Sequence, residues 1–447
     1  LRRLGVGDLQ AVVTPLAAIL ATAYEPLSVR ELVAILVHRK LLTEEGARQM
    51  VEKGLAAIAS MVRSAPDPEG EVGYCLFHQS LRDHMTGSDQ MTHSIATARE
   101  AFADLAEQEN QPGVLRNYLL RCGIDHLFEV GRSEEAERQL LDLDHLSAMV
   151  KLGVINKTLY KYWNVLGGRD RAIKYQVSID SLQQSPTPDG LSKLSIILGL
   201  SQFSYWSSLS KLALNAELRI KKEIGLGQLE VVETLLGLAN EHMRCEAPND
   251  AYQYLSEAYS NLCESLGLSP VSPSELKIPE VISVGEKSEK IDLVLKLSDI
   301  FDAIGYAFEL KIELDSKHEE RDRIVKFEKQ KRSYFENAFK IRNELLDADH
   351  KLVAASYLNL IDSIPDVDQA LKYFEKILCI RLEEYGHLHP TVAKVYKRRG
   401  WFLVKNRKQL GRKVKRADAQ TSDTKYSWVP IHVELSEKLR EYKGRSS

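Results

Sequence analysis

Apolar residues recur at helical spacing through most of the chain, starting near its N-terminal end. Thr14 followed by Pro15 predicts the start of a first helix, because threonine caps helices and proline fits the first turn. Ser28 and Glu31 form the capping-box pattern of a second helix. A third helix follows. Its apolar face is predicted to hold Val51, Leu55, Ile58 and Val62, which are spaced by 4, 3 and 4 residues.

A loop rich in proline at residues 66–70 and a predicted strand at residues 72–77 follow these helices. Three helices followed by a strand hairpin is the order of a winged-helix domain, which we assign to residues 8–88. A winged helix that reads DNA needs a basic third helix, whereas here Glu44 and Glu45 offset the basic residues. We therefore expect this domain to pack against protein and not to bind nucleic acid.

The stretch at residues 74–85 joins the predicted strand to the next helix and reads YCLFHQSLRDHM. Together with AILATAYEPLSVRELVAIL and VEKGLAAIASMV before it, this stretch resembles the winged-helix domain that follows the nucleotide-binding core in STAND NTPases of the NACHT and NB-ARC type. The resemblance implies that His78, at the end of the wing strand, contacts a phosphate of bound ADP in the inactive state. An imidazole N–H can donate to a phosphate oxygen. The alternative is that His78 only caps the strand end or bonds a local carbonyl.

The phosphate-binding loop of that family is missing from these 447 residues, since no GxxxxGKS or GxxxxGKT sequence occurs. The first residue is Leu1 and not methionine, so we expect a piece of a longer protein, in which the nucleotide-binding core either precedes this chain or is absent. On this interpretation the chain itself is not an enzyme and holds no metal or cofactor. ADP or ATP would bind only to the upstream core.

Residues 89–150 are predicted to form a helical bridge. Apolar residues at helical spacing cover residues 92–108 and 115–130. Residues 118–150, YLLRCGIDHLFEVGRSEEAERQLLDLDHLSAMV, resemble the helical segment that joins winged helix to repeats in STAND proteins. His126 and His145 lie near several aspartates, yet no pair has the spacing of a zinc site. We therefore interpret both histidines as residues on helix faces.

Internal repetition marks residues 151–404, which we predict to form an α-solenoid of helical hairpins. The clearest copies begin at Tyr334 and Tyr373, contain His350 and His389 at matching places, and are offset by 39 residues. They resemble tetratricopeptide repeats of the longer-loop kind found beside STAND and kinesin-light-chain proteins. Stacked hairpins leave a concave face, where we expect a protein or peptide ligand to bind.

Three stretches depart from the repeat. Residues 268–290 contain three prolines and are interpreted as a loop insertion too broken for a helix. Residues 315–332 are dense in charges of both signs and predict a long solvated helix. Residues 405–447 begin with a basic run, interpreted as a solvated helix end in preference to a nucleic-acid patch, and continue with alternating apolar residues around Pro430 that are expected to cap the solenoid.

The composition excludes some classes of protein but indicates no specific catalytic or binding site. Hydrophobic residues make up 44% of the chain, charged residues 28%, and the net charge is −3, so no global field attracts nucleic acid or an anionic membrane. No apolar run reaches the roughly 20 residues that span a bilayer. The five scattered cysteines predict reduced thiols in the core of a cytoplasmic protein.

This mainly α architecture favours the sensor half of a signalling NTPase. The repeats would bind a trigger, the winged helix would relay that binding to the upstream NTPase domain, and an oligomer would form on activation. The resemblance implies a role in innate immune or anti-phage defence. Two alternatives stay open, a tetratricopeptide-repeat scaffold without nucleotide switching and a winged-helix transcription regulator.

Overall fold

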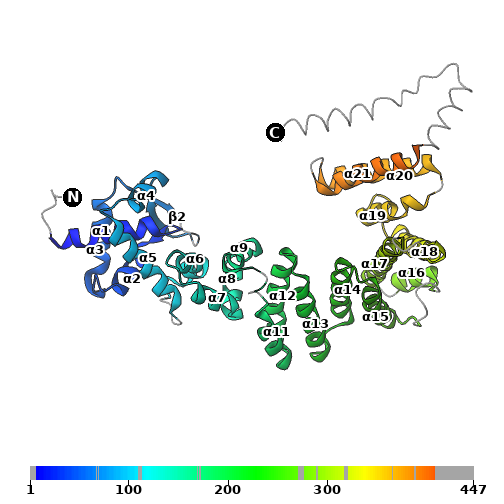
Figure 1. The fold of residues 1–447 in the computed structure, drawn as a ribbon, viewed down its shortest axis with the longest axis horizontal. Helices are drawn as coiled ribbons and strands as arrows, with labels where there is room; N and C mark the ends of the chain where they lie inside the picture. Colours follow the sequence, from blue (N-terminus) through cyan, green and yellow to red (C-terminus); the bar gives the residue numbers. More distant parts are fainter. Residues whose placement is uncertain are drawn as a thin grey trace, which may run out of the picture. The chain divides into compact units, whose positions relative to one another are not determined.

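The structure is a computed structural model, and it describes residues 7–407 except 67, 69, 109–112, 169, 171–172, 270–275, 288–289, 317–320, 365 and 387–388. Helices account for most of these residues, which confirms the mainly α prediction (Figure 1). Contacts divide the chain into two units, Leu1–Tyr254 and Leu255–Ser447.

The N-terminal unit opens with three helices and a small antiparallel sheet. These elements are α1 (Gly7–Thr22), β1 (Leu27–Ser28), α2 (Val29–His38), α3 (Glu44–Ala57), β2 (Val62–Pro66) and β3 (Val72–Leu76). β3 is the central strand and pairs antiparallel with both neighbours, so the sheet order is β1-β3-β2. The side chains of Leu16, Leu27 and Leu32 have no exposed surface, and they place the core of this region between the helices and the sheet.

Local sequence signals at the second and third helices have different outcomes. The capping box is confirmed, because the Ser28 hydroxyl accepts from the Glu31 N–H at 3.3 Å and the Glu31 carboxylate accepts from the Ser28 N–H at 2.7 Å. The predicted place of Val62 on the third helix is wrong. α3 ends at Ala57, and Val62 pairs with Leu76 across the sheet. Strand pairing, a long-range interaction, thus overrides helical spacing at this position.

The predicted start of the first helix at Thr14 is also wrong. α1 begins at Gly7, and Pro15 lies inside the helix. Proline there removes one hydrogen bond of the helix. Val12 and Val13 are each only 3% exposed, so burial of these two side chains against the core offsets that loss.

A succession of helices completes the N-terminal unit. They are α4 (Gln79–Thr86), α5 (Thr92–Glu107), α6 (Arg116–Glu129), α7 (Ser133–Leu141), α8 (Leu143–Lys151), α9 (Asn156–Leu166), α11 (Tyr175–Gln184), α12 (Pro188–Phe203), α13 (Ser207–Glu223) and α14 (Gln228–Arg244), while α15 (Pro248–Leu266) crosses the boundary between the units. The helices predicted at residues 92–108 and 115–130 are confirmed as α5 and α6. Neighbouring helices pack side by side, as α12, α13 and α14 do in Figure 1.

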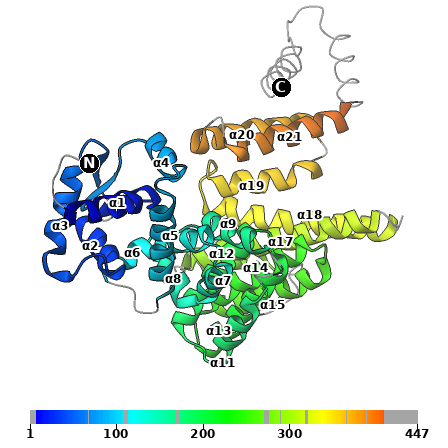
Figure 2. The same ribbon diagram turned by 60° about the vertical axis from the view of Figure 1, so that its left-hand side comes forward.

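The C-terminal unit is a stack of helices that pack against their neighbours along the chain. They are α16 (Ile278–Lys287), α17 (Ile291–Ser316), α18 (Arg321–Leu345), α19 (Lys351–Leu360), the 3-10 helix η1 (Ile361–Ser363), α20 (Val367–Tyr385) and α21 (Pro390–Lys405). Figure 2 shows α19, α20 and α21 lying next to one another. Their common core includes Phe374, Ile377 and Val395, none of which has exposed surface.

The two unusual stretches of this unit differ in outcome. The loop predicted at residues 268–290 is wrong in part, because α16 lies within it. Pro279 is the second residue of α16, where a helix needs no N–H, and burial of Ile278 and Val281 holds the helix in place. The helix predicted over residues 315–332 is confirmed from Arg321 onward as the first part of α18.

Candidate functional site

The residue implicated by the family resemblance, His78, lies at the corner between β3 and α4. The chain enters this corner held by the Phe77 N–H, which donates to the Met61 carbonyl at 3.0 Å. It leaves in α4, where the Arg82 guanidinium donates to the carbonyl of Ala23, just after α1. Both ends of the corner are therefore fixed to the N-terminal unit, while the His78 side chain itself is exposed.

The imidazole of His78 is the N-cap of α4. Its Nδ1 accepts from the Ser80 N–H at 3.1 Å and lies 2.5 Å from the Ser80 hydroxyl oxygen. An Nδ1 that accepts a hydrogen bond carries no proton, so the neutral ring has its proton on Nε2. Within the part of the chain that the structure describes, Nε2 has no hydrogen-bond partner. Next to it the Phe77 side chain is 56% exposed. The corner thus presents one exposed N–H donor, which can donate to an anionic oxygen.

The same cap recurs in the C-terminal unit. His350 Nδ1 accepts from the Leu352 N–H at 3.2 Å at the start of α19, and His389 Nδ1 accepts from the Thr391 N–H at 3.3 Å at the start of α21. The repeat offset of 39 residues therefore joins positions with the same local structure. Among the residues that the structure describes, three histidines are helix N-caps, and this role by itself accounts for a histidine in this setting.

A shallow open cavity of about 270 Å³ adjoins one of these caps in the C-terminal unit. It is lined by Asp349, His350, Lys351, Ile380, Glu383 and Glu384. The Lys351 ammonium lies 3.0 Å from the Glu384 carboxylate, and this hydrogen bond raises the pKa of Lys351 above its usual value. The cavity lies between the α18–α19 turn and α20, and charged side chains form its rim.

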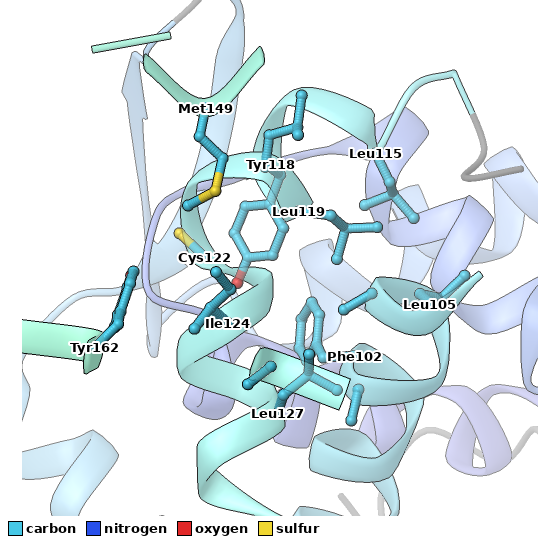
Figure 3. Packing of buried hydrophobic residues seen from close by; sticks show 14 of the residues in the cluster. Phe102, Leu105, Leu115, Tyr118, Leu119, Cys122, Ile124, Leu127, Met149 and Tyr162 are labelled. Atoms are coloured by element: carbon cyan, nitrogen blue, oxygen red, sulfur yellow. The ribbon is translucent and has the colours of Figure 1, made fainter. Parts of the chain in front are cut away.

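A buried polar cluster that the sequence did not reveal lies between α5 and α6. His126 has no exposed surface, its ring stacks on Phe102 with centroids 4.2 Å apart, and its Nε2 lies 2.8 Å from the Tyr118 hydroxyl. That hydroxyl also accepts from the Tyr24 N–H at 3.2 Å, so the cluster ties the end of α1 to α6. Figure 3 shows Tyr118 and Phe102 enclosed by apolar side chains.

The surroundings of His126 make it a structural residue. Burial lowers the pKa of His126, although Glu129 and Asp125 oppose that shift, so the ring is held neutral. In the described residues no three His, Cys, Asp or Glu side chains are grouped to hold a metal ion. The placement of His126 on an apolar helix face is confirmed, and the spacing of Tyr118, Cys122 and His126 every four residues is the signal that marks the buried side.

A second buried cluster in the C-terminal unit is an ion pair. Arg342 on α18 is 3% exposed. Its guanidinium donates to Ser298 (2.9 Å), Asp302 (2.5 Å) and Asp299 (2.7 Å) of α17 and to Ser356 (2.7 Å) of α19. All three guanidinium nitrogens have partners, and four of the five N–H groups donate to them, so this cluster joins three helices.

The remaining predictions concern the tail and the membrane. The cap predicted within residues 405–447 lies almost entirely outside the described residues, which end at Arg407. None of the helices described is both long and apolar enough to cross a bilayer. A scan against models of known protein families finds no match for this chain, and no curated protein matches it significantly.

Proposed function

We propose that this chain is the protein-binding sensor and regulatory half of a STAND-type signalling NTPase in the cytoplasm. In this proposal residues 8–88 are a winged helix and the C-terminal helices are tetratricopeptide-like repeats that bind a protein or peptide trigger. The observation that carries the proposal is the exposed Nε2 donor of His78, fixed at the strand–helix corner where the resemblance places a phosphate contact.

The proposed mechanism is a two-state switch. With ADP in an upstream nucleotide-binding core, the Nε2–H of His78 donates to a phosphate oxygen and stabilises the closed state. A trigger that binds the repeats more tightly in the open state shifts the population towards it, and nucleotide exchange and oligomer formation follow. The nucleotide chemistry belongs to the upstream core, and this chain supplies recognition and the contact that holds the switch closed.

The cap geometry of His78 provides a sharp test in the natural protein that carries this chain with its upstream sequence. His78→Ala removes both the cap and the Nε2 donor, whereas His78→Asn restores a cap acceptor and still lacks the donor. We expect both variants to bind ADP about 10- to 100-fold more weakly, the loss of a hydrogen bond to a charged group, and to signal without the trigger. If the Asn variant binds ADP and signals like the natural protein, His78 acts only as a helix cap and does not contact the phosphate.

A second function, a repeat adaptor without a nucleotide switch, is favoured by one observation. His350 and His389 cap helices in the same way as His78, so no nucleotide is needed to account for it. The coding sequence upstream of Leu1 distinguishes the two. A GxxxxGKS or GxxxxGKT loop there supports the switch, and an unrelated domain supports the adaptor.

A further inference from the structure

The last described helix, α21, has an apolar face that no described residue covers. Val392, Val395 and Phe402 are buried on one side of the helix, and the rings of Phe402 and Phe374 lie 5.6 Å apart. The other side carries Tyr396, Trp401 and Val404, which are 41%, 72% and 60% exposed. Large apolar groups gathered on one helix face are typical of an unfilled packing surface.

The preceding repeat shows what covers such a face. Tyr357 on α19 occupies the position that matches Tyr396, and its ring stacks on Tyr373 of α20 with centroids 4.5 Å apart. In that repeat, therefore, an aromatic side chain from the next segment of the chain lies against the matching tyrosine. Residues 406–424 align with α20 in the sequence but contain few apolar residues, so their sequence lacks the apolar face of a repeat helix.

The first apolar segment after α21 is residues 426–435. It contains Tyr426, Trp428, Val429, Ile431, Val433 and Leu435. Glu434 is the one acidic or basic residue of this segment apart from His432, whereas α21 has five basic and no acidic residues, so the charges are complementary. The length of chain between them suffices, because the residues after Arg407 can extend by about 3.3 Å each, whereas α21 is only about 24 Å long.

We propose that residues 426–435 fold back onto the exposed face of α21 and close the end of the repeat stack. Tyr426 or Trp428 then lies over Tyr396 as Tyr373 lies over Tyr357. Repeat stacks require a different segment at each end to cover the last apolar face, and this chain carries that segment in its own sequence. The inference is independent of the nucleotide switch proposed above.

Tryptophan quenching in the full 447-residue chain tests the proposal. In a Trp428→Phe background three tryptophans remain, and Trp163 and Trp206 are only 0% and 7% exposed, so acrylamide quenching reports on Trp401. We expect Trp401 to be shielded in this background. Adding Ile431→Asp and Val433→Asp should release the segment and raise the quenching constant of Trp401 several-fold, with the protein monomeric by light scattering throughout.

The matched control is Ser422→Asp with Thr424→Asp, which adds the same charge to the same tail but removes no apolar group. This pair should leave Trp401 shielded. Equal quenching of Trp401 in the Trp428→Phe background and in both double variants would overturn the proposal. This holds whether Trp401 is accessible to acrylamide in all three proteins or shielded in all three. A dimer whose dilution exposes Trp401 would also overturn it, because a second copy would then be the occupant.

Discussion

The buried guanidinium of Arg342 gives the most quantitative prediction. Arg342→Met keeps most of the side chain's length and removes its charge and donors. The change leaves Asp302, whose side chain is 13% exposed, without its cation inside the unit, and removes the bonds to Ser298 and Ser356. The free energy of opening the α17–α19 region should therefore fall, because a buried carboxylate has lost its compensating charge.

The size of the loss in stability depends on whether the groups that Arg342 contacts can form other hydrogen bonds. Removing one member of a buried ion pair costs about 3–5 kcal/mol. Asp299 is 41% exposed and can hydrate, and Asp302 keeps a hydrogen bond of 3.0 Å from Asn359. The lower end of that range, about 3 kcal/mol, is therefore expected. Native-state hydrogen exchange of the full chain should show it as an increase of about 100-fold in the exchange rate of α17–α19 amides.

A matched control comes from the next repeat. Arg381 lies 39 residues after Arg342 at the matching position, and its Nε has no hydrogen-bond partner among the residues that the structure describes. Arg381→Met should therefore change stability by only about 0.5 kcal/mol. Equal effects of the two substitutions, or an unchanged exchange rate in Arg342→Met, would refute the assignment of Arg342 as a buried connection between helices.

Three further predictions concern packing, caps and pH. Gly305→Ala should cost about 1–3 kcal/mol in thermal or chemical unfolding, because an added Cβ would lie 2.4 Å from the Phe335 ring, whereas Gly400→Ala meets nothing within 4 Å and should stabilise α21 by about 0.5–1 kcal/mol. His389→Ala should cost about 1 kcal/mol and His389→Asn much less, and hydrogen exchange of the first turn of α21 would detect the difference. Burial lowers the pKa of His126 below its usual 6.5, so the unfolded chain binds a proton that the folded chain excludes. Urea unfolding should accordingly show the N-terminal unit less stable at about pH 5.5 than at about pH 7.5, and a flat profile would contradict the burial of a neutral ring.

Signals confined to a few neighbouring residues could be predicted from the sequence. The Ser28–Glu31 capping box needs only the two side chains and the first turn of a helix, and it is present as expected. The repeat offset was also visible, since His350 and His389 occupy the same cap. His78 was identified by resemblance. Its role as the N-cap of α4 was not predicted, and its proposed phosphate contact stays a prediction.

Features that depend on distant partners could not be predicted. Val62 has the spacing of a helix face, but its neighbour is Leu76 across the sheet. The sequence around Arg342 does not distinguish it from an exposed charged residue on a helix. Its burial depends on two aspartates of α17, which are distant in the sequence. Pro279 was interpreted as part of a loop because proline disrupts the middle of a helix. It is tolerated in the first turn, however, and the burial of Ile278 shows that α16 begins there.

The Arg342 cluster also bears on how a stack of repeats changes its length by duplication. The acceptors of this guanidinium come from α17 and α19, so a hairpin inserted before α18 would bury a positive charge against a helix without carboxylates. The α20–α21 hairpin meets α19 through the stacked rings of Tyr357 and Tyr373. Such a junction can be copied, since each copy brings its own tyrosines. A hairpin added at the C-terminal end would therefore leave the Arg342 contacts intact, whereas one added before α18 would separate the guanidinium from its carboxylates.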